Sequence, residues 1–292
     1  MKPHAVTSVP LLTAAGLATI GGALGWLALT GRTEVSTSAD AEATPVPLLS
    51  VVVALAVGLL LTRLVPPRLP VLAPAGDEAR AALTRQVSAL VGIAVGFALL
   101  ALALGPGSVW YGPLKVAVLL GGAWLVLRVW PAPSPGGREH RRAVPVWWYW
   151  LGPLPAIAGW AWLAYYSPLA TTTDLSGYRE YDPAFLITAM LLTFLTASVL
   201  EEIFYRAVLQ TRLEALLGRW PAIAATALLF AAMHTHRIGS GPLAETVAVV
   251  LVFNGGFGLF LGYLWARYRN IWALILAHGA VNSLTLLPIF FA

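Results

Sequence analysis

Nine apolar runs dominate the sequence, and each is long enough to cross a lipid bilayer as an α-helix. A hydrocarbon core of about 30 Å requires roughly 20 residues at about 1.5 Å per residue. Inside lipid the backbone must satisfy its own hydrogen bonds, so such runs fold as helices. The sequence therefore predicts an all-α, polytopic transmembrane helix bundle with about eight or nine spans. The runs lie near residues 9–30, 47–65, 87–104, 114–130, 147–166, 184–206, 221–236, 244–266 and 271–290.

The composition agrees with a membrane protein and narrows the possible chemistry. The chain is 59% hydrophobic and only 11% charged, whereas soluble domains are about one quarter charged. It contains no cysteine, which excludes disulfides, thiolate nucleophiles and thiolate metal sites. The net charge of +5 comes from basic residues in short loops rather than from one basic face. We therefore expect the lipid bilayer, and no nucleic acid, as a partner.

The charges of the loops predict the orientation of the chain in the membrane. Arg residues are in excess in loops 63–86 and 128–146, whereas acidic residues are in excess in loops 31–46 and 167–183. Cytoplasmic loops carry the excess of Lys and Arg in most membrane proteins. The pattern therefore predicts a cytoplasmic N-terminus and an external C-terminus. The first run exceeds a signal-peptide core in length, so we expect it to be retained as a span.

A flexible break divides the chain into two parts. The sequence Pro-Ala-Pro-Ser-Pro-Gly-Gly opens the segment 131–146 and is followed by a basic cluster. The four runs before the break contain almost no charge at depth, and the five runs after it contain nearly all the deep polar residues. We therefore predict an accessory transmembrane bundle in residues 1–146 and a catalytic core in residues 147–292.

Two adjacent carboxylates and a guanidinium follow the apolar run 184–200 directly, as Glu201, Glu202 and Arg206. An ionised group in hydrocarbon costs at least about 2.5–3.5 kcal/mol, so charged residues at this depth are usually paired and functional. On a helix, Glu202 and Arg206 share one face, and Glu201 is turned about 100° away. The spacing predicts a Glu202–Arg206 ion pair that leaves Glu201 free for chemistry.

A predicted hairpin brings His234 to the level of these carboxylates. If residues 184–217 form one helix that reverses at Gly218, facing positions have numbers that sum to about 436–437. His234 then lies at the height of Glu202.

The last apolar run supplies two further polar residues. His278 and Asn282 are four residues apart and share a helical face. Glycines at 255, 256 and 258 in the run before it permit close approach between helices. We therefore expect both side chains to lie at the depth of Glu201 and His234 and to form one polar cavity with them.

These three motifs carry a family resemblance. Glu-Glu-x-x-x-Arg, Phe-x-x-x-His and His-x-x-x-Asn, in this order on successive apolar runs, resemble the CAAX-protease and bacteriocin-processing (CPBP or Abi) family of intramembrane proteases. The resemblance covers roughly residues 184–290. It implies that Glu201 is the catalytic glutamate, with Glu202 and Arg206 in support, and that the remaining site residues are His234, His278 and Asn282. Ala207 departs from the family, in which a glycine often follows the arginine.

Two mechanisms use these residues. In the first, Glu201 activates a water molecule, His234 orients it, and His278 with Asn282 stabilises the oxyanion. In the second, Glu201, His234 and His278 hold Zn²⁺ with an open fourth position. The first, which requires no cofactor, is preferred, because zinc bound by Glu201 would leave only Glu202, tied to Arg206, as a nearby base.

The resemblance implies a membrane-anchored protein or peptide substrate, namely a prenylated CAAX tail, a bacteriocin-like peptide or a C-terminal sorting tail. It also implies the cytoplasmic membrane of a bacterium, and we expect the active site towards the cytoplasmic half. The competing classes are a proton-coupled transporter, in which Glu, His and Arg form a relay, and an inactive membrane scaffold or immunity protein. The sequence predicts no oligomeric state.

Overall fold

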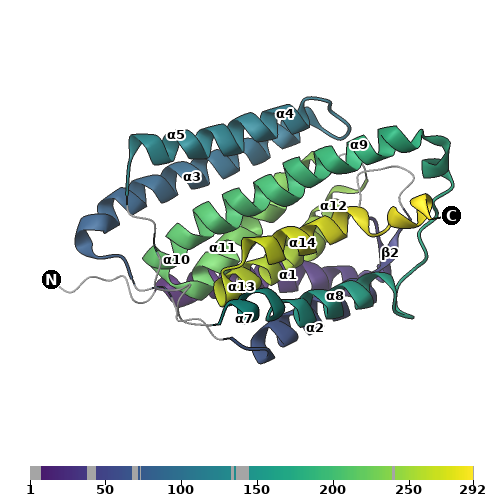
Figure 1. The fold of residues 1–292 in the computed structure, drawn as a ribbon, viewed down its shortest axis with the longest axis horizontal. Helices are drawn as coiled ribbons and strands as arrows, with labels where there is room; N and C mark the ends of the chain where they lie inside the picture. Colours follow the sequence, from purple (N-terminus) through teal and green to yellow (C-terminus); the bar gives the residue numbers. More distant parts are fainter. Residues whose placement is uncertain are drawn as a thin grey trace.

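The computed structural model describes residues 8–37, 44–67, 72, 74–132, 135, 145–238 and 241–291. It is an elongated bundle whose helices run mostly along the long axis (Figure 1). Within the described residues, five helices are long and apolar enough to cross a membrane, and two shorter apolar helices cover Leu48–Leu64 and Ile271–Ser283. The predicted all-α transmembrane bundle is confirmed. The number of spans stays a prediction.

Helices and one short hairpin make up the first part of the chain. Two strands of two residues each pair antiparallel in the loop between the first two helices, where we predicted no strand. The elements are α1 (Ser8–Leu29), β1 (Glu34–Val35), β2 (Val46–Pro47), α2 (Leu48–Leu64), α3 (Asp77–Leu104), α4 (Tyr111–Lys115), the π-helix η2 (Val116–Gly121) and α5 (Gly122–Val129).

The second part is helical throughout its described elements. In order, these are α7 (Val146–Leu151), α8 (Leu154–Tyr165), η3 (Gly177–Glu180), α9 (Pro183–Thr193), η4 (Phe194–Val199), η5 (Glu202–Gln210), α10 (Thr211–Leu217), α11 (Arg219–Ala232), η6 (Met233–Arg237), α12 (Leu243–Val249), η7 (Val250–Gly255), α13 (Gly256–Tyr268), α14 (Ile271–Ser283) and η8 (Leu287–Phe290). The segments η4, η5 and η7 are π-helical turns within longer helices, and η3, η6 and η8 are 3₁₀ helices. Such π turns are frequent at functional sites.

The predicted hairpin is present with the predicted register. The helix from α9 to α10 is continuous, and the chain reverses at Gly218, whose φ of 87° suits a residue without a side chain. Thr226 on α11 contacts Gln210 at 3.4 Å, and the Phe230 ring centroid lies 4.9 Å from the Arg206 guanidinium. The residue numbers of each pair sum to 436. The end of α11 therefore lies beside the Glu-Glu motif.

Two predicted spans differ from the observed helices. The run 147–166 is broken at Gly152 and Pro153, where α7 gives way to α8, because proline lacks the backbone N–H that helix continuation uses. The helix in the run 271–290 ends at Ser283, and a turn precedes η8. Apolar composition predicts the length of a buried run but not these internal breaks.

The loops of opposite charge lie at opposite ends of the bundle. The α1–α2 and α8–α9 connections lie at the right end of Figure 1, and the α2–α3 and α5–α7 connections lie at the left end. Parts of loops 31–46, 63–86 and 128–146 lie outside the described residues. The described chain begins at the left end and finishes at the right end (Figure 1). This arrangement agrees with the prediction that the two termini are on opposite sides of the membrane.

One core joins the two predicted parts of the chain. Leu90 and Phe97 of α3 belong to the same buried apolar cluster as Phe230 of α11 and Phe260 of α13. The division into an accessory bundle (1–146) and a catalytic core (147–292) stays a prediction. The first part nevertheless packs directly against the second part in one shared core.

Close helix packing around α13 depends on its glycines, as the sequence predicts. A Cβ atom on Gly258 would lie 3.0 Å from the Cα atom of Ala227 and 3.3 Å from its carbonyl oxygen. Backbone atoms at this distance cannot rotate away as a flexible side chain can. Gly258 therefore allows α11 and α13 to touch along their backbones.

We expect Gly258→Val to lower the free energy of unfolding by about 1–3 kcal/mol, because the added atoms overpack the α11–α13 contact. Thermal unfolding of the detergent-solubilised protein measures this change. Gly96→Ala on α3 is the control, because its Cβ would meet nothing within 4 Å. Equal stability of the two variants would contradict the close contact.

Candidate active site

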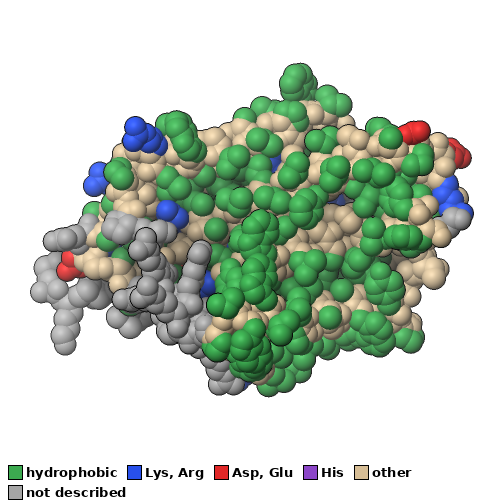
Figure 2. Space-filling view, in the orientation of Figure 1, with side chains coloured by type: hydrophobic (Ala, Val, Ile, Leu, Met, Phe, Trp, Pro, Cys, Tyr) green, Lys and Arg blue, Asp and Glu red, His purple; other side chains and the backbone are tan. Residues whose placement is uncertain are grey.

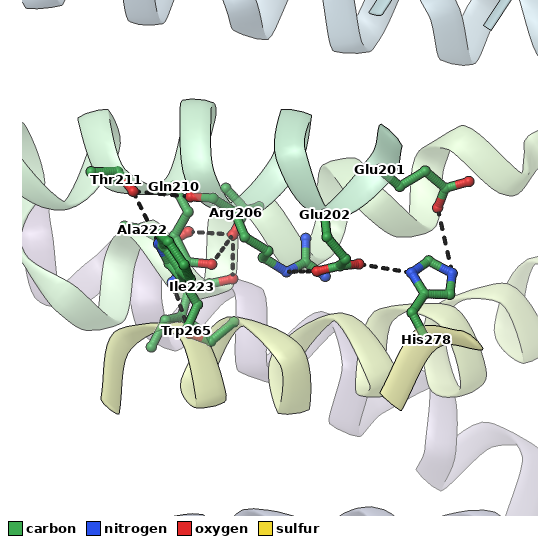
Figure 3. Close-up of polar contacts among 11 residues, drawn as sticks. Glu201, Glu202, Arg206, Gln210, Thr211, Ala222, Ile223, Trp265 and His278 are labelled. Carbon is green, nitrogen blue, oxygen red and sulfur yellow. Dashed lines mark hydrogen bonds and ion pairs between the residues drawn. The ribbon is translucent and has the colours of Figure 1, made fainter. Parts of the chain in front are cut away.

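Five buried side chains from three helices form a continuous series of polar contacts. We call this series the ionic cluster: Lys115, Glu201, His278, Glu202 and Arg206. Figure 3 shows the part from Glu201 through His278 and Glu202 to Arg206. All five side chains are buried. Charged groups this deep are stable only in mutual contact.

The predicted pair between Glu202 and Arg206 is confirmed. Both side chains are fully buried, and the Arg206 Nε atom lies 3.5 Å from Glu202 Oε2. This distance suits an ion pair better than a hydrogen bond, and no Arg206 nitrogen has a hydrogen-bond partner among the described residues. The guanidinium also lies over the Phe230 ring at 4.9 Å. Arg206 is therefore held by charge and by an aromatic face.

Glu201, which we predicted to be left free for chemistry by the Glu202–Arg206 pair, has a cation partner of its own that the sequence did not indicate. Lys115 Nζ donates to Glu201 Oε1 at 2.5 Å, and both side chains are buried. Because Glu201 is turned away from Glu202 on the helix, its carboxylate reaches α4 instead of Arg206. The second oxygen, Oε2, is buried without a hydrogen-bond partner in the described part of the chain.

Lys115 also corrects our expectation that the first four runs contain almost no buried charge. It is 4% exposed and lies at the end of α4. Its sequence signal was a lysine near the start of an apolar run, with no acidic residue close to it in the chain. Such a residue predicts a partner on another helix, but the sequence alone does not say which one.

His278 connects the two carboxylates. Its Nδ1 atom lies 2.8 Å from Glu202 Oε1, and its Nε2 atom lies 3.8 Å from Glu201 Oε2. The rings of Phe257 and Phe230 pack against the imidazole edge to face, at 5.6 and 5.8 Å between centroids. The ring is thus fixed by one strong contact and two aromatic neighbours.

A cavity of about 370 Å³ lies beside the ionic cluster. His278, His234 and Asn282 line it, and Asn254 of η7 and His236 of η6 line it as well. Glu201 does not line the cavity and is 2% exposed behind His278. The structure thus brings the predicted residues to one buried place, although their catalytic roles remain predictions.

The other predicted residues are oriented by their own helices. His234 Nδ1 lies 2.9 Å from the Phe230 carbonyl oxygen, which accepts a hydrogen from that nitrogen in the corresponding tautomer. Asn282 Nδ2 donates to Ser198 Oγ at 3.1 Å. An amide nitrogen carries two hydrogens, so this contact leaves Asn282 a second donor.

From the sequence we assigned no role to His236. Its ring packs on the Tyr111 ring at 4.4 Å between centroids, and the Tyr111 hydroxyl donates to the Met233 carbonyl oxygen at 3.4 Å. Tyr111 and Lys115 lie one turn apart on the same face of α4. This turn therefore lines the site from the first part of the chain.

We expect Glu202→Gln and Arg206→Gln each to lower the free energy of unfolding by about 3–5 kcal/mol, because each leaves an unpaired charge at depth. Thermal unfolding in detergent measures the loss. The double variant is the control and should recover part of the stability, since it buries no unpaired charge. Unchanged stability in both single variants would show that the two side chains do not form the pair.

Lys115→Met should lower stability by a similar amount, about 3–5 kcal/mol, because Glu201 loses its cation. Lys115→Arg keeps the charge and should lose less. In the double variant Lys115→Met/Glu201→Gln, thermal stability should return most of the way to the original value. Additive losses in the double variant would exclude the Lys115–Glu201 contact.

Residues 183–284 match the family described as Rce1-like, type II CAAX prenyl endopeptidase. No curated protein and no solved structure is significantly similar to the chain. The matched segment extends from the start of α9 to just beyond α14 and includes every site residue predicted from the sequence. In this segment, about one third of the chain, the protein is similar to the Rce1-like family of CAAX proteases.

Proposed function

We propose that this protein is an intramembrane endopeptidase in which Glu201 activates water to cleave a peptide bond of a membrane-anchored polypeptide. The family match supports a CAAX-type endopeptidase in general. The observation that carries the mechanism is the 3.8 Å separation of Glu201 Oε2 and His278 Nε2, next to a polar cavity.

The contacts of His278 favour a neutral ring with its hydrogen on Nδ1. That atom faces the Glu202 carboxylate, which can only accept a hydrogen bond when ionised. Two carboxylates and two cations already balance in the ionic cluster, so a neutral imidazole keeps the buried group uncharged overall. The Nε2 atom is then an acceptor, like Glu201 Oε2 opposite it.

Two acceptors 3.8 Å apart suit a water molecule that donates one hydrogen to each. A water oxygen about 2.8 Å from both atoms is compatible with their separation. Glu201 takes a proton as this oxygen attacks the carbonyl carbon of the substrate. The tetrahedral intermediate then expels the amine, which receives the proton from Glu201. The products are an amine and a new carboxylic acid that keeps the second proton of the water until it ionises in solution, and the carboxylate of Glu201 is restored.

The remaining site residues stabilise the charge that develops during attack. Asn282 has a second amide hydrogen and lines the cavity, so we assign it as a donor to the oxyanion. His234 lines the same cavity and orients the substrate carbonyl or the water. Lys115 holds Glu201 in place and stabilises its anionic form electrostatically. Glu202 and Arg206 fix the tautomer and position of His278.

The geometry of the side chains does not favour the zinc mechanism. Catalytic zinc is usually held by three protein ligands. The Nδ1 atoms of His234 and His278 contact protein oxygens, which leaves each Nε2 atom available as a ligand. However, no three His, Asp or Glu side chains gather as a metal set in the described ranges. We therefore assign no step to a metal.

We expect Glu201→Gln to lower peptide hydrolysis by about 10²–10⁴-fold, because the amide cannot act as a base. His234→Ala and His278→Ala should be nearly inactive, and Asn282→Ala should lose about 10²–10³-fold if its amide donates to the oxyanion. The assay follows fragments of a lipidated CAAX peptide by mass spectrometry, with purified protein in lipid vesicles.

Two controls accompany this measurement. Trp272→Ala alters an exposed side chain on the same helix as His278 and should leave hydrolysis unchanged. Activity should also survive a chelator in metal-free buffer. Loss of activity on chelation with recovery in Zn²⁺ would replace the proposed mechanism by the zinc mechanism. Full activity of Glu201→Gln would remove the basis for this function.

A further inference from the structure

The cavity beside the ionic cluster opens at one end of the bundle. Its inner wall contains His278 and Asn282, whereas its outer part is lined by Thr44 of the α1–α2 connection and by Thr173 and Tyr178 of the α8–α9 connection. The backbone N–H of Asp174 donates to the Thr44 hydroxyl at 3.0 Å. The two connections therefore meet at the mouth of the cavity.

The bundle end that holds this mouth is acidic. Its described residues include Glu34, Asp174, Glu180, Asp182 and Glu245 against Arg32, Arg179 and Arg237, and Arg32 pairs with Glu245. The pKa of Asp174 is lowered by a backbone hydrogen bond from Ser176. The opposite end is basic. Its described residues include Arg63, Arg80, Arg85, Arg128, Arg212, Arg219, Arg267 and Arg269 against Asp77 and Glu214.

The surface shows the same polarity. In Figure 2, the right end shows Asp and Glu side chains beside a basic group, the left end shows several Lys and Arg side chains and one acidic group, and apolar side chains cover the surface between them. By the positive-inside rule, the left end faces the cytoplasm and the right end faces outward.

The site itself lies nearer to the acidic end. Lys115, the partner of Glu201, is one turn from Tyr111, the first residue of its helix, and about 20 Å along the helix from Arg128 at the basic end. Thr235, next to His234, donates to the carbonyl oxygen of Ala98, in the last two turns of α3. Two separate helices thus place the site at the same level.

We infer that the cavity is entered from the non-cytoplasmic side of the membrane, and that its substrate is an anchored polypeptide whose cleaved segment lies on the outer side. This inference rests on the proposed function for the act of cleavage, but the direction of the cavity follows from the fold and the charges. It replaces our expectation that the site lies towards the cytoplasmic half. That expectation came from distances along single helices, without the connections that form the mouth.

The cavity also limits what can enter. Trp160 and Phe257 contribute aromatic walls, and Asn254 contributes a buried Oδ1 atom without a hydrogen-bond partner among the described residues. A volume of about 370 Å³ is within the range of small-molecule sites. The cavity therefore admits only a few residues at once. A short extended segment with apolar side chains fits this lining better than a folded domain does.

Cysteine labelling tests the direction of the cavity, because the natural chain has no cysteine. Thr285→Cys lies on the cavity wall, and Thr173→Cys lies at the mouth. Both should react with a membrane-impermeant maleimide in intact cells. Leu276→Cys faces outward on α14 and should not react, since its thiol lies in lipid. Ala81→Cys, at the basic end, should react only after permeabilisation.

Labelling of Thr285→Cys and Thr173→Cys only in permeabilised cells, or of neither, would overturn the inference. Hydrolysis of the lipidated CAAX peptide provides a separate result. A maleimide bound at Thr285→Cys should reduce hydrolysis at least tenfold, because it fills the cavity, whereas the same label at Ala81→Cys should have no effect. A protein that is labelled from outside but never cleaves would overturn the proposed function and leave the direction of the cavity in place.

Discussion

The structure depends on neutralising two adjacent carboxylates inside a membrane protein. Glu201 and Glu202 must both be buried, and an unpaired charge at this depth would cost several kcal/mol. Consecutive residues on a helix point in different directions, so one cation cannot serve both. Lys115 on α4 pairs with Glu201, and Arg206 on the same helix pairs with Glu202. Three helices are thereby tied together at one level, with His278 completing the series.

This arrangement gives the two carboxylates different tasks. Glu202 Oε1 contacts His278 Nδ1 and holds the imidazole in place, and Oε2 lies 3.5 Å from Arg206 Nε in an ion pair without a hydrogen bond. Glu201 has one oxygen held by Lys115 and one oxygen without a hydrogen-bond partner in the described structure. A base needs an oxygen that can reach water. The proposal that Glu201 is the base rests on the position of its Oε2 atom opposite His278 Nε2, whereas both oxygens of Glu202 face His278 Nδ1 and Arg206.

The basic end of the bundle is held by a second group of buried charges. Glu214 forms an ion pair with Arg269 at 2.6 Å, and Arg219 lies 3.8 Å from the same carboxylate. These contacts join α10, which contains Glu214, to the start of α11 at Arg219 and to the turn after α13 at Arg269. The cavity opens at the opposite end, where connections rather than buried ion pairs form the rim. The fold thus closes one end of the site and leaves the other open to substrate.

The sequence by itself determined the all-α class, the hairpin register and the Glu202–Arg206 pair, because each follows from apolar length, helical period or one turn at Gly218. It also predicted that His234, His278 and Asn282 would line one cavity, but Glu201, which we expected among them, does not line it. Only the tertiary structure decided that Lys115 is the partner of Glu201. Lys115 is far from Glu201 in the chain, so the helical period of the segment that contains Glu201 does not predict the contact. The tertiary structure also decided at which end of the bundle the cavity opens, since its mouth forms where the α1–α2 and α8–α9 connections meet.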